Sequence, residues 1–172
     1  MTMANLDQLK ARVPDHAKDM RINLGVVTSS TALTPAQAWT IAVTCAHTTR
    51  VAPLIDAVEA DAALEPAALA AARGAAAIMA MNNVYYRFVH FTGDEYAHMP
   101  ARLRMQLIGA PGIAKLDFEL ACLAASAITG CESCVRAHDK SARERGATRE
   151  MVHDAVRIAA VINGVATALP HG

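Results

Sequence analysis

The sequence predicts an all-α protein, and three observations support that prediction. Helix start and stop signals recur along the chain, most clearly Thr34-Pro35-Ala36-Gln37 and the prolines at positions 66, 100 and 111. Long stretches are rich in alanine, the residue with the highest helix propensity. No stretch of useful length alternates between apolar and polar residues as a half-buried strand does.

The first helices are predicted from spacing and from capping residues. Near the N-terminus, apolar residues recur at helical spacing: Leu6, Leu9 and Val13. The next clear helix begins at Thr34, whose hydroxyl can cap free amides, with Pro35 where no N–H is needed and Gln37 placed to reach back. Pro66 then begins a long helix that continues through AALAAARGAAAIMAMNN.

The remaining helices are predicted from breakers and caps in the second half. Met99-Pro100 and Pro111-Gly112 bound the short segment ARLRMQLIG. Thr148 can cap the last helix. The helices are expected at about 115–129, 132–145 and 148–167.

The chain is expected to form one domain of residues 1–172, because no linker or low-complexity tract divides it. Trp39–Asn83 can be overlaid on Leu120–Gly164, which indicates a degenerate internal repeat. We therefore distinguish an N-terminal half, 1–99, from a C-terminal half, 100–172. In the overlay, the cysteine pair of the second half falls opposite Arg50 and Pro53.

The composition disfavours two classes of partner. Acidic and basic side chains number 16 each, so no basic excess is available to neutralise a nucleic acid backbone. The uncharged stretches are shorter than the ~20 residues that a bilayer requires, and the N-terminus lacks the apolar core of a secretory signal. A cytoplasmic protein without nucleic acid or membrane partners is expected.

The candidate chemistry lies in GCESCVRAHDK, residues 130–140. Cys131 and Cys134 are expected in the first turn of a helix, where the free amides stabilise a thiolate. His138 lies one turn beyond Cys134 and about two turns from Cys131. Cys134 is therefore the better-placed nucleophile, with His138 as its general base. Cys45 and Cys122 lie in apolar runs and are expected to be buried thiols.

A carboxylate that orients His138 would make it a stronger base. Glu119 is the candidate, because its helix leads directly into the cysteine turn and an antiparallel return could place it beside His138. Three other carboxylates compete with it and are expected to be solvated charges at helix ends: Asp117, Glu132 and Asp139.

Other uses of the cysteine pair are less favoured by the sequence. A zinc site usually needs four ligands, and His138 with His153 would complete a set only at an unusual spacing. Haem attachment requires a histidine where Val135 stands, and a thioredoxin-type motif requires a preceding strand. No metal ligand is assigned, although a zinc-held interaction module stays open as an alternative.

These residues resemble the AhpD-like alkylhydroperoxidases, the AhpD family of alkyl hydroperoxide reductases. The resemblance rests on GIAKLDFELACLAASAITGCESCVRAHDKSARERGATREMVHDAVRIAAVINGVATAL and, in the first half, on LGVVTSSTALTPAQAW and AAAIMAMNNVYYRF. It implies an all-helical fold with an internal repeat, often trimeric, and a lipoyl-dependent peroxidase that reduces alkyl hydroperoxides.

The resemblance also implies a role for each site residue. Cys134 would become the sulfenic acid, Cys131 would be proton donor and resolving thiol in a redox disulfide, and Glu119 with His138 would form a proton relay. No tightly bound cofactor is implied. The implied reductant is a lipoyl dithiol on an acyltransferase, and the implied partner is a peroxiredoxin in mixed disulfide with Cys131.

One position departs from some family members, which carry histidine where this chain has Ser133. The serine hydroxyl retains hydrogen-bonding capacity. The alternative enzyme is one of the related carboxymuconolactone decarboxylase-like fold, in which the dithiol would have no catalytic part.

Overall fold

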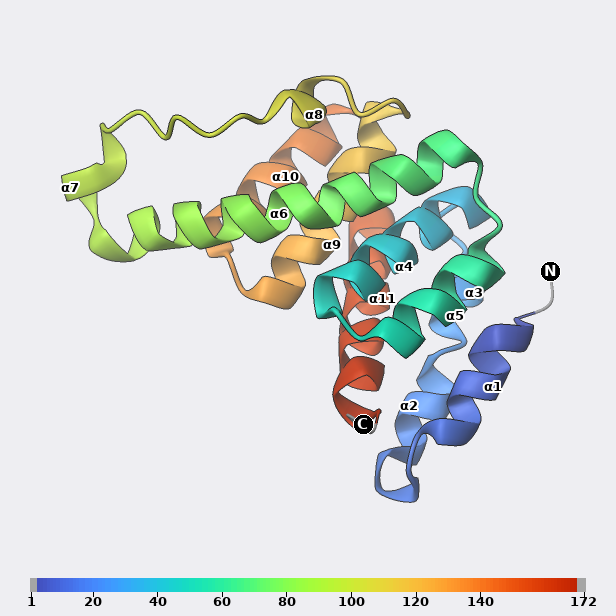
Figure 1. Ribbon diagram of the computed structural model, residues 1–172. Coiled ribbons are helices and arrows are strands. Elements are labelled where there is room, and N and C mark those ends of the chain that lie inside the picture. The colour runs from blue at the N-terminus through green and yellow to red at the C-terminus, as the bar shows by residue number, and fades with distance from the viewer. Residues whose placement is uncertain (1–2, 170–172) are drawn as a thin grey trace.

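The computed structural model describes residues 3–169, and every regular element in that range is a helix (Figure 1). The all-α prediction is confirmed. Residues 1, 2 and 170–172 of the predicted domain lie outside the described residues. The elements are α1 Ala4–Arg12, the 3₁₀ turn η1 Asp15–Ala17, α2 Lys18–Asn23, α3 Val26–Ser29, α4 Pro35–Thr49, α5 Ala52–Ala62, α6 Pro66–Thr92, α7 Asp94–Ala97, α8 Gln106–Gly109, α9 Lys115–Thr129, α10 Glu132–Glu144 and α11 Arg149–Ala168.

Helices α4 and α9 form the centre of the molecule. They pack against each other, and each also packs against α6 and α11 (Figure 1). Their buried faces carry many small side chains, such as Ala42 and Ala46 on α4 and Ala121 and Ala125 on α9, all fully buried. Small side chains let helix backbones approach closely. The many alanines therefore allow these helices to pack closely in one core.

The predicted helix starts agree with the structure. Thr34 accepts a hydrogen bond from the Gln37 amide at 3.2 Å, and the Gln37 side chain accepts one from the Thr34 amide at 2.9 Å, which completes the capping box. Thr148 accepts a bond from the Met151 amide at 3.2 Å. The segment between Pro100 and Pro111 differs, since only Gln106–Gly109 is helical.

A similar turn occurs twice, once between α4 and α5 and once between α9 and α10. Arg50 and Gly130 both adopt the left-handed conformation, with φ of 63° and 70°. The next residues, Val51 and Cys131, both cap the following helix with φ of −90°. Val51, rather than Arg50, therefore occupies the place of Cys131, and the sequence overlay is wrong by one residue. The left-handed residue that both turns share, Arg50 in one and Gly130 in the other, shows which residues of the two halves correspond.

The same register accounts for the absence of a second dithiol. Relative to the starts of their helices, the positions of Glu119, Cys131, Cys134 and His138 correspond to apolar residues in the first half, namely Trp39, Val51, Leu54 and Val58. Trp39, Leu54 and Val58 are buried in the core. The first half thus uses these positions for packing alone.

Helix α6 extends beyond the body of the molecule and ends near α7 (Figure 1). The chain then returns along α6 through residues 98–110, a segment that we call the strap. Gly74 permits this close approach, because a Cβ atom there would lie 2.5 Å from Leu107 Cδ2. The strap therefore lies directly on α6.

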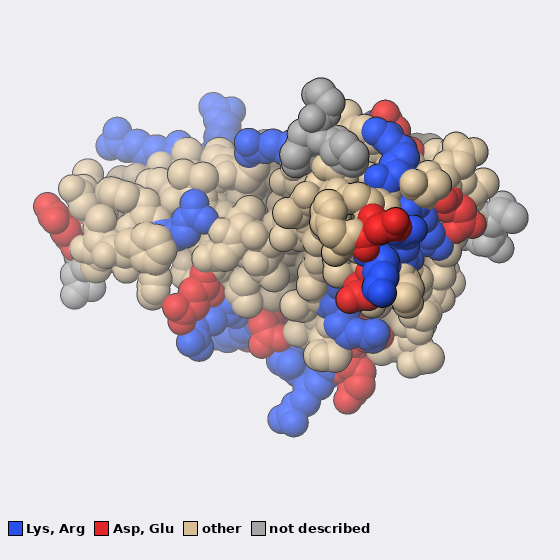
Figure 2. Space-filling model, turned by 90° about the horizontal axis from the view of Figure 1, so that it is seen from below, with Lys and Arg blue, Asp and Glu red and all other residues tan. Residues whose placement is uncertain are grey.

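Charges of both signs are interspersed on the face drawn in Figure 2. This agrees with the equal numbers of acidic and basic residues. Within residues 3–169, no helix combines the length and the apolar character needed to cross a membrane.

The paired left-handed residues give a test of the shared turn. We expect Gly130→Ala to lower the free energy of unfolding by about 1 kcal/mol, because a Cβ disfavours positive φ. Arg50→Gly should raise it by about 0.5 kcal/mol by removing the same strain. Urea unfolding of both variants measures this. Effects of the same sign would contradict the shared conformation.

Candidate functional site

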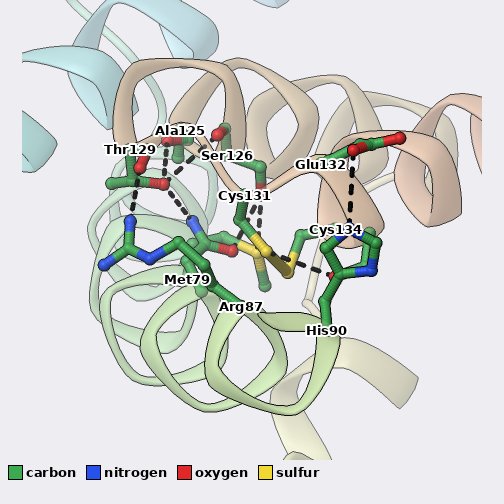
Figure 3. Close-up of a disulfide and its surroundings, with 11 residues drawn as sticks. Met79, Arg87, His90, Ala125, Ser126, Thr129, Cys131, Glu132 and Cys134 are labelled. Carbon is green, nitrogen blue, oxygen red and sulfur yellow. Dashed lines mark hydrogen bonds and ion pairs between the residues drawn. A yellow bond between two sulfur atoms is a disulfide. The ribbon is translucent and has the colours of Figure 1, made fainter. Parts of the chain in front are cut away.

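The cysteine pair lies at the junction of α9 and α10. Gly130 ends α9 in the left-handed conformation, Cys131 takes the N-cap position of α10, and Cys134 follows in its first turn. A disulfide joins the two cysteines, whose Cα atoms are 5.3 Å apart (Figure 3). Cys131 is 0% exposed and Cys134 is 6% exposed. Cys134 is thus the sulfur nearer to solvent.

Helix α6 holds this junction in place (Figure 3). Arg87 Nη1 donates a hydrogen bond to the Thr129 carbonyl oxygen at 2.6 Å. Asn83 Nδ2 donates to Thr129 Oγ1 at 2.7 Å, and Asn83 Oδ1 accepts from the Ser126 hydroxyl at 3.1 Å. These bonds satisfy polar groups at the end of α9 and fix the approach to the cysteines.

Glu119 and His138 are in direct contact, as the sequence predicts. Glu119 Oε2 lies 2.6 Å from His138 Nδ1, and Lys115 Nζ lies 3.3 Å from Glu119 Oε1. Burial raises the pKa of the Glu119 carboxyl. The hydrogen bond and charge of His138, and then Lys115, together lower it by more than burial raises it, so the pKa lies below the ordinary value. The buried group therefore remains a carboxylate.

The three competing carboxylates form hydrogen bonds or ion pairs with residues other than His138. Asp117 Oδ1 accepts a hydrogen bond from Gln37 Nε2 at 2.7 Å. Glu132 pairs with Arg136 on the same helix and with His90 of α6, whose Nε2 lies 3.5 Å away (Figure 3). Asp139 pairs with Arg143, four residues further on the same helix. Glu119 is thus the carboxylate that reaches His138.

A cavity of about 240 Å³ adjoins Cys134 and His138. The two residues lie one turn apart on α10, so both can face the same space. Glu119 binds Nδ1 of the imidazole, which leaves Nε2 to exchange protons. The other walls come from α6 and the strap, through Asn82, Tyr86, Met105 and Ile108.

The remaining candidates lie away from this cavity. Cys45 and Cys122 are both 0% exposed, as predicted, and burial raises the pKa of each thiol. His153 is largely exposed and lies beside Asp154 on α11. The structure does not bring it to the cysteine pair. Within residues 3–169 no group of three or more His, Cys, Asp or Glu side chains could hold a metal ion.

Helix α6 contributes residues to the site that the sequence alone did not predict. Asn82, Asn83 and Arg87 approach the cysteine turn from a helix almost fifty residues earlier in the chain. The sequence does contain one sign of this contribution, since two adjacent asparagines interrupt an otherwise apolar helical run. Buried polar residues usually have hydrogen-bond partners, so this pair indicates polar contacts across α6.

Comparisons with known proteins identify relatives of this chain. Residues 94–171 match the carboxymuconolactone decarboxylase family. Over 168 residues the chain is 50% identical to a Rhodospirillum centenum protein named alkyl hydroperoxide reductase AhpD, covering 96% of this chain and 90% of the relative. Proteins of the same name from Bradyrhizobium sp. strain BTAi1 and Gluconacetobacter diazotrophicus are 51% and 49% identical, each covering 96% of this chain and 93% and 92% of the relatives.

Replacing Glu119 with glutamine tests the contact with His138. In a Cys131→Ser background, we expect Glu119→Gln to slow alkylation of Cys134 by iodoacetamide roughly tenfold at pH 7, because an uncharged amide makes the imidazole a weaker base. Mass spectrometry of the labelled protein gives the rate.

Asp117→Asn is the matched control, since it removes a carboxylate from the same helix that does not contact His138. It should leave the rate unchanged. Equal rates in Glu119→Gln and the parent protein would contradict a role for Glu119 in activating Cys134.

Proposed function

Because this chain belongs to the alkyl hydroperoxide reductase AhpD family, we propose that it is a thiol peroxidase that reduces alkyl hydroperoxides through Cys131 and Cys134. The observation that carries the proposal is the 2.6 Å contact of Glu119 with His138, one turn from Cys134 at the edge of a shared cavity. This arrangement supports the assignment of Cys134 as nucleophile, His138 as its base and Glu119 as the group that orients the base.

The first step is removal of the Cys134 proton. His138 accepts it at Nε2, directly or through one water, while Glu119 holds the other ring nitrogen and stabilises the imidazolium. The first turn of α10 adds its free amides, which favour an anion. The result is a thiolate at neutral pH.

The thiolate then attacks the distal oxygen of the hydroperoxide. The O–O bond breaks, Cys134 becomes a sulfenic acid, and the proton held by His138 passes to the leaving alkoxide, giving an alcohol. The Cys131 thiol next attacks the sulfenic sulfur, which forms the disulfide and releases water. Proximity within one helical turn makes this step fast.

A dithiol must reopen the disulfide, and we propose a lipoyl group of a partner acyltransferase as reductant. The attacking thiolate forms a mixed disulfide with one cysteine and displaces the other as a thiol. Because Cys131 is fully buried and Cys134 lines the cavity, exposure favours attack at Cys134. This differs from the mixed disulfide at Cys131 that the family resemblance implies for a peroxiredoxin partner.

Ser133 stands where some family members carry histidine. Its hydroxyl lies 3.5 Å from Cys131 Sγ. It supports the same turn with a hydrogen bond but supplies no base, so all proton transfer in the proposed mechanism passes through His138.

The family match over residues 94–171 keeps a carboxymuconolactone decarboxylase-like activity as the second candidate. The two candidates differ in their use of the cysteines. A thiol peroxidase needs both cysteine thiols, whereas a carboxymuconolactone decarboxylase-like enzyme needs neither. Thiol chemistry therefore separates them without knowledge of the physiological substrate.

Thiol counting tests the proposed function. One equivalent of tert-butyl hydroperoxide should consume two thiols together in the reduced protein, and Cys134→Ser should abolish turnover with dihydrolipoamide as reductant. Cys45→Ser, a buried cysteine outside the site, is the control and should retain turnover. Peroxide consumption by Cys134→Ser near the original rate would show that the nucleophile is misassigned.

We also propose that the chain self-associates as a homotrimer through the projecting part of α6. Three exposed apolar residues lie there at helical spacing, namely Val84, Phe88 and Phe91. An apolar stripe of this kind on a soluble protein is typical of an interaction surface.

Sedimentation equilibrium tests this surface. Phe91→Ser, at a side chain 76% exposed, should convert the assembly to monomers. Ile22→Ser removes an equally exposed apolar residue elsewhere and should leave the mass unchanged. An unchanged mass for Phe91→Ser would exclude the stripe as the interface.

A further inference from the structure

Asn82 is a buried polar residue on the α6 wall of the cavity. It is 3% exposed, and its Oδ1 has no hydrogen-bond partner among residues 3–169. Its neighbour Asn83 is equally buried but is bonded to Ser126 and Thr129. Leaving a buried polar group unpaired costs free energy, and such groups are usually bonded. The Asn82 carboxamide therefore has hydrogen-bonding capacity that the described residues leave unused.

The surroundings of Asn82 indicate which ligand fits. Asn82 lines the same cavity of about 240 Å³ as Cys134 and His138. The wall from the strap is apolar, with Met105 and Ile108, and Tyr86 OH lies 4.0 Å from Met105 Sδ. One side of the cavity thus offers a carboxamide beside the reactive sulfur, and the other offers apolar side chains.

A carboxamide matches a hydroperoxy group in its hydrogen-bonding capacity. Its oxygen accepts a hydrogen bond and its NH₂ group donates two, while a hydroperoxide has one O–H donor and oxygen acceptors. An alkyl group attached to the hydroperoxide would meet the apolar wall. Both parts of an organic hydroperoxide therefore find a counterpart in the cavity.

We propose that the Asn82 carboxamide hydrogen-bonds the hydroperoxy group of the substrate, so that the distal oxygen is held for attack by Cys134. This inference rests on the proposed function and adds to it the residue that recognises the substrate. The alkyl group lies against Tyr86, Met105 and Ile108. The cavity volume is below the usual range for drug-sized ligands, so compact organic hydroperoxides are the class that fits.

The first test is Asn82→Leu, which keeps a similar volume and removes the polar group. For tert-butyl hydroperoxide, we expect kcat/KM to fall roughly tenfold, mainly through KM, because one hydrogen bond to the substrate is lost. Alkylation of Cys134 by iodoacetamide should keep its rate. The melting temperature should be unchanged or higher, since an unpaired buried amide is removed.

Asn163→Leu makes the same substitution at an exposed position on α11 and should match the original protein in all three measurements. The inference is overturned if Asn82→Leu keeps its kcat/KM. It is also overturned if alkylation slows by the same factor as turnover, because Asn82 would then act on the dithiol instead of the substrate.

A binding measurement separates this inference from the proposed function. In the oxidised protein, tert-butanol, the product alcohol, should shift the Asn82 side-chain amide resonance in a saturable manner by NMR. This readout needs no turnover. If the protein consumes no hydroperoxide, the proposed function fails, while the shift still supports a binding role for Asn82. A resonance that does not move would overturn that role.

Discussion

The hydrogen bond between Glu119 and His138 is the interaction on which the rest of the site depends. It joins α9 to α10 across the cysteine turn and selects which ring nitrogen is left for chemistry. A buried carboxylate is costly unless it is paired, and here His138 and Lys115 both pair with it. The same contact thus stabilises a buried charge and fixes the orientation of the imidazole.

The same turn occurs in both halves of the fold, but only the second carries the candidate site. A turn with one left-handed residue followed by an N-cap occurs in both halves, so the geometry belongs to the fold. In the first half the equivalent side chains are apolar, and Trp39, Leu54 and Val58 are buried in the core. The two turns thus differ in their side chains and share their backbone geometry.

Much of the fold could be predicted from the sequence because its signals are local. The capping box at Thr34 and the cap at Thr148 depend on residues within one turn, and both are present. The contact of Glu119 with His138 was also predictable, since adjacent helices joined by a tight turn lie antiparallel. The Asn82 and Arg87 contributions were not, because they depend on how α6 packs across the second half. Alanine-rich helices carry too little pattern to fix that packing or the register of the repeat.

His138, held by Glu119, is proposed to keep Cys134 ionised at neutral pH, and the whole mechanism rests on that ionisation. Titration of the thiolate absorbance of reduced protein in a Cys131→Ser background measures it most directly, with His138→Gln in that background for comparison. We predict that Cys134 ionises well below the pKa of about 8.5 of a free cysteine, and that His138→Gln returns it towards that value. A Cys134 thiol that titrates at or above about 8.5 in both proteins would contradict this role of His138.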